Sequence, residues 1–189
     1  MLGITSFMSS NCILTELDFF IYYQKDYNPE FNYAVTSMLV SVFVQAYLVF
    51  FTHKLGSYRS LLFISMISFI SILFLIPLIV VFLPELLGFI AMLLVMVFIG
   101  VMGTTISSSI YGIVSILPAK YIIAMSAGQA FSGIILNIIK YIILLTFDST
   151  DGKSPDETKS IYFQEVYIFY SSATAFVVAT AICVMVRKY

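Results

Sequence analysis

Long apolar runs recur along the whole chain and leave few choices of fold. The hydrocarbon core of a bilayer is crossed by about 20 consecutive, mostly apolar residues in a helix. Six segments of this kind are separated by shorter polar stretches, at 1–23, 33–52, 59–83, 86–117, 121–147 and 162–186. Because backbone groups in lipid must bond within their own segment, each is expected to be a helix. The sequence therefore predicts one all-α integral membrane domain with six transmembrane helices.

The amino-acid composition also points to lipid as the surrounding solvent. Hydrophobic residues fill 61% of the 189 positions and charged residues only 10%, whereas a soluble domain carries about 25% charged residues. A water-soluble fold of this length could not cover so much apolar surface with so few polar groups. We therefore expect the lipid bilayer as a partner. No basic stripe is present, so we expect no nucleic-acid partner.

Lysine and arginine residues are unevenly divided between the two sides of the predicted helices. With six helices both termini share one side, which carries five of the nine basic residues, whereas the other side carries three. The two sets are Lys54, Arg59, Lys120, Arg187 and Lys188, against Lys25, Lys153 and Lys159. Because basic loops stay in the cytoplasm, the sequence predicts a multi-pass protein with both termini cytoplasmic. The plasma membrane and an internal membrane both remain open.

Polar residues inside the predicted spans are candidates for function, because a polar group in hydrocarbon must find a partner or line water. On the fifth segment, Gln129, Gly133, Asn137 and Lys140 recur at helical spacing and share one face. A lysine in mid-membrane costs about 3 kcal/mol on an insertion scale. Two explanations for Lys140 stay open, namely snorkelling toward the outer surface and a water-filled cavity.

The fourth segment carries a second polar stripe. Gly100, Thr104, Ser107 and Tyr111 recur there at helical spacing, and Gly103 broadens the stripe. The glycines fit close packing between membrane helices. The hydroxyl groups fit equally well as the lining of a cavity or as donors to carbonyls of their own helix.

On the first segment, Asn11 is the deepest strongly polar residue, and Thr15 lies one turn further along the same face. Glu16 and Asp18 follow, and either an interfacial position or a functional role would explain them. Gln45 on the second segment either bonds a neighbouring helix or faces a pathway.

No pattern typical of an enzyme occurs in the sequence. The single histidine, His53, lies beside Lys54 at a predicted helix end, and there is no metal-ligand spacing, phosphate-binding glycine loop or nucleophile motif. Cys12 and Cys183 each lie in an apolar run, so a disulfide framework is not expected. We therefore expect a protein that is not an enzyme, with no catalytic residue, no metal site and no cofactor.

The stretch from Gly103 to Gly133 resembles the fourth and fifth helices of the equilibrative nucleoside transporter family. In that family the fourth helix has a Gly, and further on a polar pair followed by an aromatic residue and a Gly. A Leu-Pro pair comes next, with a Tyr shortly after it. The fifth helix then has a Gly-Gln pair followed by small residues. The residues in register without a gap are Gly103, Ser109, Tyr111, Gly112, Leu117, Pro118, Tyr121, Gly128, Gln129 and Gly133. Weaker matches, at Asn11, Thr15, Phe19 and Phe20 and at Phe31, Asn32 and Thr36, extend the resemblance over most of the chain.

The resemblance implies the N-terminal six-helix half of a carrier with a fold like the major-facilitator type, in which two helical bundles enclose a central cavity. The implied substrate is a nucleoside or nucleobase, and the implied partner is a second transporter half, in a longer parent or on another chain. The implied substrate-binding residues are Asn11, Ser107, Gln129 and Lys140, and the implied helix-packing residues are Gly103, Gly112, Gly128 and Gly133. Ser107 stands where the family has the Gln that contacts the nucleobase, so base selectivity stays open.

Two other interpretations remain open at this point. The chain could be a truncated, non-transporting membrane protein that pairs with or regulates a full-length carrier. It could also be a generic helical channel or scaffold.

Overall fold

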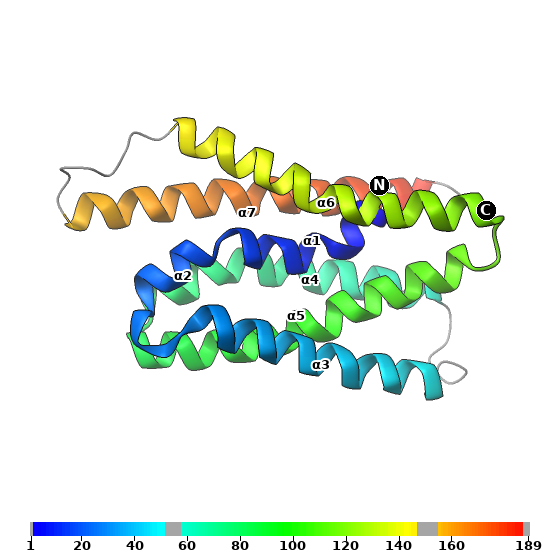
Figure 1. The fold of residues 1–189 in the computed structure, drawn as a ribbon, viewed down its shortest axis with the longest axis horizontal. Coiled ribbons are helices and arrows are strands. Elements are labelled where there is room, and N and C mark those ends of the chain that lie inside the picture. The colour runs from blue at the N-terminus through cyan, green and yellow to red at the C-terminus, as the bar shows by residue number, and fades with distance from the viewer. Residues whose placement is uncertain (1, 52–57, 147–154, 187–189) are drawn as a thin grey trace.

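The computed structural model describes residues 2–51, 58–146 and 155–186, and these ranges are built almost entirely of helices (Figure 1). The elements are α1 (Leu2–Thr15), α2 (Leu17–Tyr23), the short 3₁₀ helix η1 (Lys25–Tyr27), α3 (Pro29–Phe51), α4 (Tyr58–Phe82), α5 (Glu85–Val114), α6 (Ala119–Thr146) and α7 (Pro155–Val186). No strand occurs in the described ranges, and the predicted all-α class is confirmed.

Within the described ranges, five helices are long and apolar enough to cross a membrane. They are α3, Ser60–Phe82 within α4, α5, α6 and Ser160–Cys183 within α7. Their outward faces carry many exposed large apolar side chains. Soluble proteins rarely expose so much apolar surface to water, whereas contact with lipid accommodates it. The chain therefore has the architecture of a multi-pass membrane protein.

The first predicted segment, 1–23, is two helices instead of one. α1 ends at Thr15 and α2 begins at Leu17, with Glu16 between them at φ −103° and ψ 21°. The Glu16 N–H is shared between the carbonyls of Cys12 and Ile13, both at 3.2 Å, as is common at helix ends. The Thr15 hydroxyl also donates to the Asn11 carbonyl at 2.7 Å, a local bond that bends helices. Hydropathy alone could not reveal this break.

Other predicted boundaries shift for local reasons. α3 begins at Pro29, earlier than expected, because proline is well suited to the first turn of a helix. α5 ends at Val114, three residues before the predicted end at 117, because Pro118 disfavours helical geometry in the residue before it. α7 begins at Pro155, again at a proline. Thr52 and Phe147, the predicted ends of two segments, lie outside the described residues.

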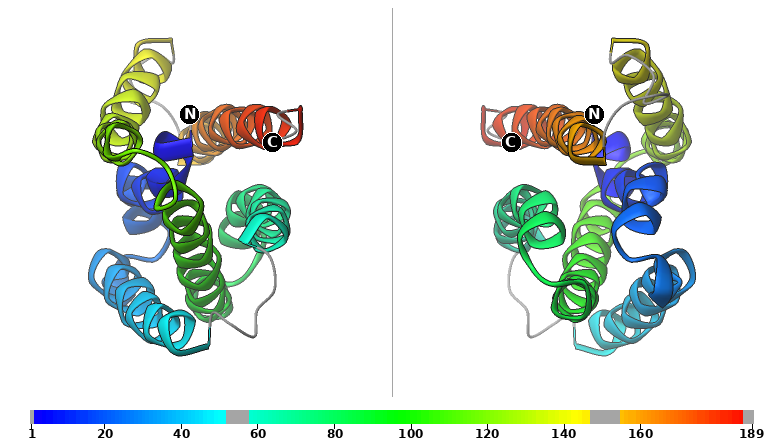
Figure 2. Two further views of the ribbon diagram at one scale, coloured as in Figure 1. Left: turned by 90° about the vertical axis from the view of Figure 1, so that its right-hand side faces the viewer. Right: turned by 90° about the vertical axis from the view of Figure 1, so that its left-hand side faces the viewer.

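The helices pack as a bundle with α1 and α5 at its centre (Figure 2). α1 contacts α5, α6 and α7, whereas α5 contacts α1, α3, α4 and, less extensively, α6. α4 and α7 contact each other on the far side of Figure 1, and α6 and α3 form the upper and lower borders of the side that faces the viewer. We call this side the front face.

Much of the apolar core lies along α4, which packs against both α5 and α7. Met66, Leu73, Met96 and Phe169 are all completely buried there. Unbranched methionine side chains fill irregular gaps between helices.

Aromatic rings gather at the end of the bundle where α2 and η1 lead into α3. The ring centroids of Tyr22 and Tyr162 are 4.9 Å apart, those of Tyr27 and Phe89 are 4.8 Å apart, and those of Tyr33 and Phe89 are 5.7 Å apart. Tyrosine is enriched at membrane–water interfaces. We call this region the aromatic end, and its composition fits a position at one membrane surface.

Candidate functional site

Hydrogen bonds between side chains connect the three helices α1, α5 and α6. The Tyr111 hydroxyl donates to Gln129 Oε1 at 2.9 Å, and Gln129 Nε2 donates to Ser6 Oγ at 3.0 Å. The Ser6 hydroxyl in turn donates to the Gly3 carbonyl at 2.8 Å, and Ser107 Oγ donates to the Ser6 carbonyl at 3.1 Å. These bonds, which we call the inner network, hold the three helices in a defined register.

Asn11 extends the inner network further along α1. Its Nδ2 donates to Ser132 Oγ at 2.7 Å, and the fully buried Ser132 hydroxyl donates to the Gln129 carbonyl at 2.6 Å. Asn11 and Gln129 are therefore linked through one serine. Asparagine and serine side chains that bond across helices are a common means of association in membranes.

Glycines bring α1 and α6 close enough for these bonds. A Cβ added to Gly128 would lie 3.2 Å from Gly3 Cα and 3.2 Å from the Ile4 nitrogen, and a Cβ added to Gly3 would overlap the Met125 carbonyl. At Gly133 a Cβ would make only an ordinary contact, 3.6 Å from Asn11 Nδ2. The tightest approach between α1 and α6 is therefore at Gly3 and Gly128, as the small-residue pattern of membrane helices requires.

The other two predicted packing glycines, Gly103 and Gly112, are half-buried on α5. The close approach on this helix is at Gly100, where an added Cβ would lie 3.0 Å from the Ser37 carbonyl and 3.1 Å from Val40 Cβ. Gly100 therefore lets α3 and α5 pack closely together.

Lys140 lies apart from the inner network, at the break between α1 and α2. Its Nζ donates to the Thr15 carbonyl, and it lies 3.8 Å from Glu16 Oε2 and 3.4 Å from Asp18 Oδ2. The Glu16 side chain is 7% exposed, whereas that of Asp18 is 80% exposed. We call Glu16, Asp18 and Lys140 the charged cluster. Ion pairing and bonding to the open end of α1 account for Lys140 better than snorkelling does.

The structure thus brings three of the four predicted substrate-binding residues, Asn11, Ser107 and Gln129, to one junction of α1, α5 and α6. It separates Lys140 from them. Asn137, on the same predicted face of α6, is exposed, and its Nδ2 donates to the Gly133 carbonyl at 2.9 Å.

Sequence reasoning missed Ser6 and the bridging role of Ser132. The Ser6 hydroxyl accepts a hydrogen bond from the Gln129 amide, and the Ser6 carbonyl accepts one from the Ser107 hydroxyl. It is a single serine in a mixed apolar stretch, and no motif marks it. Only its position on the same segment as Asn11 is a signal.

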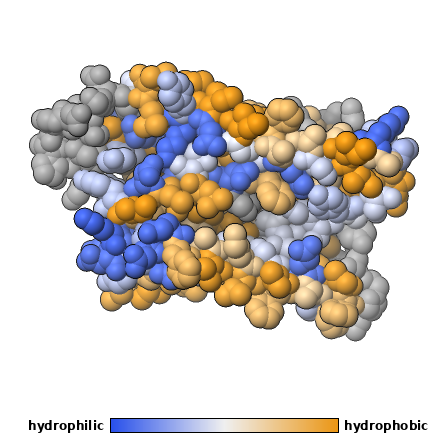
Figure 3. Space-filling view, in the orientation of Figure 1, coloured by the Kyte–Doolittle hydropathy of each residue, from blue (hydrophilic) through white to orange (hydrophobic). Residues whose placement is uncertain are grey.

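The surface of the front face is polar in its middle. Figure 3 shows hydrophilic residues between the mainly apolar surfaces of α6 at the top and α3 at the bottom. Of the inner network, Tyr111 is 40% exposed, and Gln129 is half-buried beside it. Part of the network is therefore open at the surface of the bundle.

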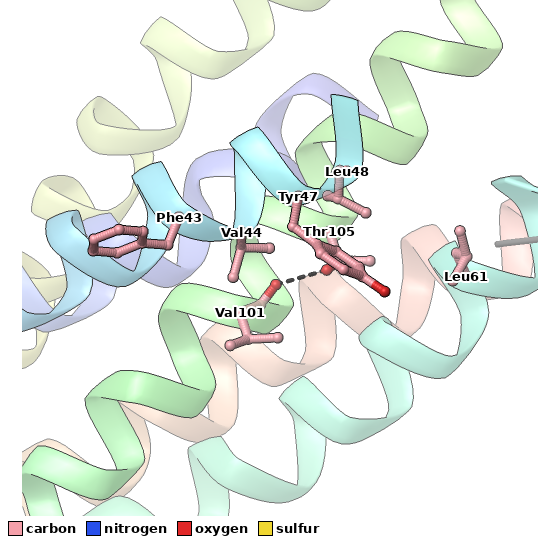
Figure 4. Close-up of a pocket in the computed structure, with 7 residues that line it drawn as sticks. All are labelled: Phe43, Val44, Tyr47, Leu48, Leu61, Val101 and Thr105. Atoms are coloured by element: carbon pink, nitrogen blue, oxygen red, sulfur yellow. Dashed lines mark hydrogen bonds between the residues drawn. The ribbon is translucent and has the colours of Figure 1, made fainter. Parts of the chain in front are cut away.

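A groove elsewhere on the bundle has a different chemistry. It has a volume of about 460 Å³ and is lined by Phe43, Val44, Tyr47, Leu48, Leu61, Val101 and Thr105 (Figure 4). The Thr105 hydroxyl donates to the Val101 carbonyl at 2.7 Å, so its donor is used within α5. Such an apolar groove between α3, α4 and α5 suits acyl chains better than a polar solute.

No protein-family model and no curated protein sequence matches the chain. Fold and site together define a multi-pass, all-α membrane protein with a polar junction between three of its helices.

Proposed function

We propose that the chain is the N-terminal half of a facilitative carrier for nucleosides or nucleobases, as the sequence resemblance implies. The observation that carries this proposal is the position of Gln129, held between Tyr111 and Ser6 at the α1–α5–α6 junction. Its amide is close to the partly exposed Tyr111 hydroxyl. A nucleobase has donors and acceptors that can replace the Tyr111 bond to this amide.

Six spans result if α1 and α2 are taken as one broken span. At about 1.5 Å per residue, their 14 and 7 residues extend over about 31 Å, close to the roughly 30 Å of the hydrocarbon core. Broken helices at membrane depth are typical of transporter binding regions. In the proposed orientation both termini are cytoplasmic and the aromatic end faces outward.

The pattern of helix contacts supports a repeat of three helices. In such a repeat α1 would correspond to α5, α3 to α6, and α4 to α7. The α1–α6 contact then corresponds to the α5–α3 contact, and the α1–α7 contact to the α5–α4 contact. All four contacts occur. The α1–α5 and α4–α7 contacts convert into themselves. In the described part of the chain, the α6–α7 contact lacks an equal counterpart between α3 and α4, and the small α5–α6 contact lacks one between α1 and α3. Inverted repeats of three helices are typical of each half of a major-facilitator carrier.

In the proposed mechanism no covalent step occurs. The ring and hydroxyls of the solute exchange hydrogen bonds with water for bonds with Asn11, Ser107 and Gln129, and apolar walls cover the ring faces. Each of these side chains already donates to a protein acceptor, so the solute competes with an existing bond. Selectivity then depends on which buried groups a wrong solute leaves unpaired.

Uptake of radiolabelled nucleosides and nucleobases into liposomes containing the purified chain tests the proposal. We expect saturable uptake of at least one purine or pyrimidine compound, above that of protein-free liposomes. Uptake equal to that of protein-free liposomes, from chain that remains folded, would exclude transport by this chain alone. The longer parent or the pair of halves would then be assayed in transporter-deficient cells, and failure there with all compounds would remove the nucleoside assignment.

A second candidate function is a non-transporting membrane protein that pairs with or regulates a full-length carrier. One observation favours it: the side-chain donors of Asn11, Ser107 and Gln129 are all satisfied within the bundle, as in an interface that only holds helices together. Co-purification with a full-length carrier, and a change in that carrier's uptake when the chain is removed, would support this candidate. Uptake by the isolated chain would exclude it.

A further inference from the structure

The charged cluster has no part in the proposed exchange of hydrogen bonds with a solute. Glu16 lies in the turn that separates α1 from α2, and Lys140 reaches it from α6. Because Lys140 also donates to the Thr15 carbonyl, it connects α6 to the open end of α1. The cluster is therefore a charged link between α6 and the only break between helices in the first predicted span.

The depth of the cluster makes it unusual. The seven residues of α2 follow Glu16 before the chain reaches the aromatic end, which places the carboxylate about 10 Å inward from that end. Acidic residues inside membrane bundles are rare, and they mark ion pathways and proton relays. A carboxylate that is 7% exposed at this depth needs a partner for its charge, and Lys140 supplies it.

A second observation at the same place comes from α7. Tyr170 is 2% exposed, and its hydroxyl has no hydrogen-bond partner among the described residues. Its electrostatic neighbours are Glu16 and Cys12. A buried hydroxyl without a partner is exceptional in native structures, and here the nearby charge of Glu16 acts on it.

The groups that face Glu16 come from every helix around the break. They are Cys12 on α1, Asp18 on α2, Lys140 on α6, and Glu165 and Tyr170 on α7. Lys140 is the cation in this set, and Asp18 and Glu165 are the other two acidic residues. Glu16 therefore has charged neighbours of both signs.

We propose that Glu16 is a proton-binding site whose protonation releases α6 from the break between α1 and α2. The proton enters from water at Asp18, whose side chain is 80% exposed, and forms one O–H bond on the Glu16 carboxylate. No electron moves, and Lys140 keeps its own proton. Neutral Glu16 no longer pairs with Lys140 as an anion, and Lys140 retains only Asp18 and the Thr15 carbonyl. The attraction between α6 and the break is then weaker.

The consequence for transport rests on the proposed function, whereas the proton site does not. Lys140 and Gln129 lie on the same helix, α6. Loosening the outer half of α6 from α1 changes how firmly the Gln129 junction is closed. Acidity on the side of the aromatic end would then raise the rate of uptake through this chain.

Infrared titration of the purified chain in lipid nanodiscs, from mildly alkaline to mildly acidic pH, tests the proton site directly. We expect the carbonyl band of a protonated carboxyl group to appear in the native chain, to be absent from Glu16→Gln, and to persist in Asp18→Asn and Glu165→Gln. Because Glu16→Gln leaves Lys140 with one partner fewer, the double variant Glu16→Gln/Lys140→Met serves as a charge-balanced version and must also lack the band. A native chain without the band, or a band that survives in both Glu16 variants, would overturn the proposal.

A liposome assay separates this inference from the proposed function. We expect an inward proton gradient to raise nucleoside uptake several-fold in the native chain and to have no effect in Glu16→Gln. A Glu16 band without any uptake would exclude transport by this chain alone and leave the proton site in place. Gradient-independent uptake without the band would remove the proton site alone.

Discussion

Gln129 on α6 donates its amide hydrogen to the hydroxyl of Ser6 on α1, 3.0 Å away and 123 residues earlier in the chain. Between lipid-facing helices there is little hydrophobic driving force, so such bonds and close packing decide which helices associate. The Gln129–Ser6 bond is therefore a point at which the fold and the proposed binding site depend on the same atoms.

Replacing Gln129 tests this double role. Gln129→Ala removes the bonds to Tyr111 and Ser6, and we expect the free energy of unfolding to fall by about 1–2 kcal/mol and uptake to fall strongly. The matched control is Gln45→Ala on α3, where the side chain is exposed and a small effect is expected. Thermal unfolding in detergent and uptake at equal surface expression measure both effects. Equal behaviour of the two variants would contradict the assignment of Gln129 to the site.

The close approach of α1 and α6 predicts a graded response to alanine. At Gly3 and Gly128 an added methyl group meets backbone atoms, which cannot rotate away, so each variant should lose about 1–3 kcal/mol of stability. Gly133→Ala is the control, because its methyl group would make only an ordinary contact with Asn11. Denaturant titration of the three variants in one detergent gives the comparison. A Gly133→Ala variant as unstable as Gly128→Ala would show that the packing is closest elsewhere.

Breaking the charged cluster should destabilise the chain more than removing its exposed member. Lys140→Met leaves the buried Glu16 carboxylate without its cation, and loss of one partner from a buried pair costs about 3–5 kcal/mol. Asp18→Asn should change stability little, because an exposed ion pair contributes little. Unfolding at neutral pH measures both variants. The double variant Glu16→Gln/Lys140→Met should recover most of the loss, and failure to recover would indicate that Lys140 acts through the Thr15 carbonyl instead.

The two ends of the bundle should face opposite sides of the membrane. Lys25 lies near the aromatic end and Lys120 at the opposite end, and both are exposed. With Cys12 and Cys183 replaced by Ala, a membrane-impermeant maleimide added to intact cells should label Lys25→Cys and leave Lys120→Cys unlabelled. Labelling of Lys120→Cys alone would reverse the orientation that the basic residues predict.

The sequence by itself determined the structural class of the protein and the approximate bounds of its long helices. The predicted segment 59–83 is α4 at Tyr58–Phe82, and 121–147 is α6 at Ala119–Thr146. Both follow from local properties, because the length of an apolar run and the position of proline act on the segment that contains them. The helical spacing of polar residues also drew attention to Asn11, Ser107 and Gln129 before their partners were known.

Only the tertiary structure decided which helices meet and how the polar residues are paired. The link from Lys140 to Thr15 and the roles of Ser6 and Ser132 depend on contacts between α1 and α6, more than 100 residues apart. Hydropathy cannot reveal such contacts, because lipid and a neighbouring helix are equally apolar surroundings for a side chain. The choice between them is made by close packing at Gly3 and Gly128 and by hydrogen bonds that form only when the bundle is assembled.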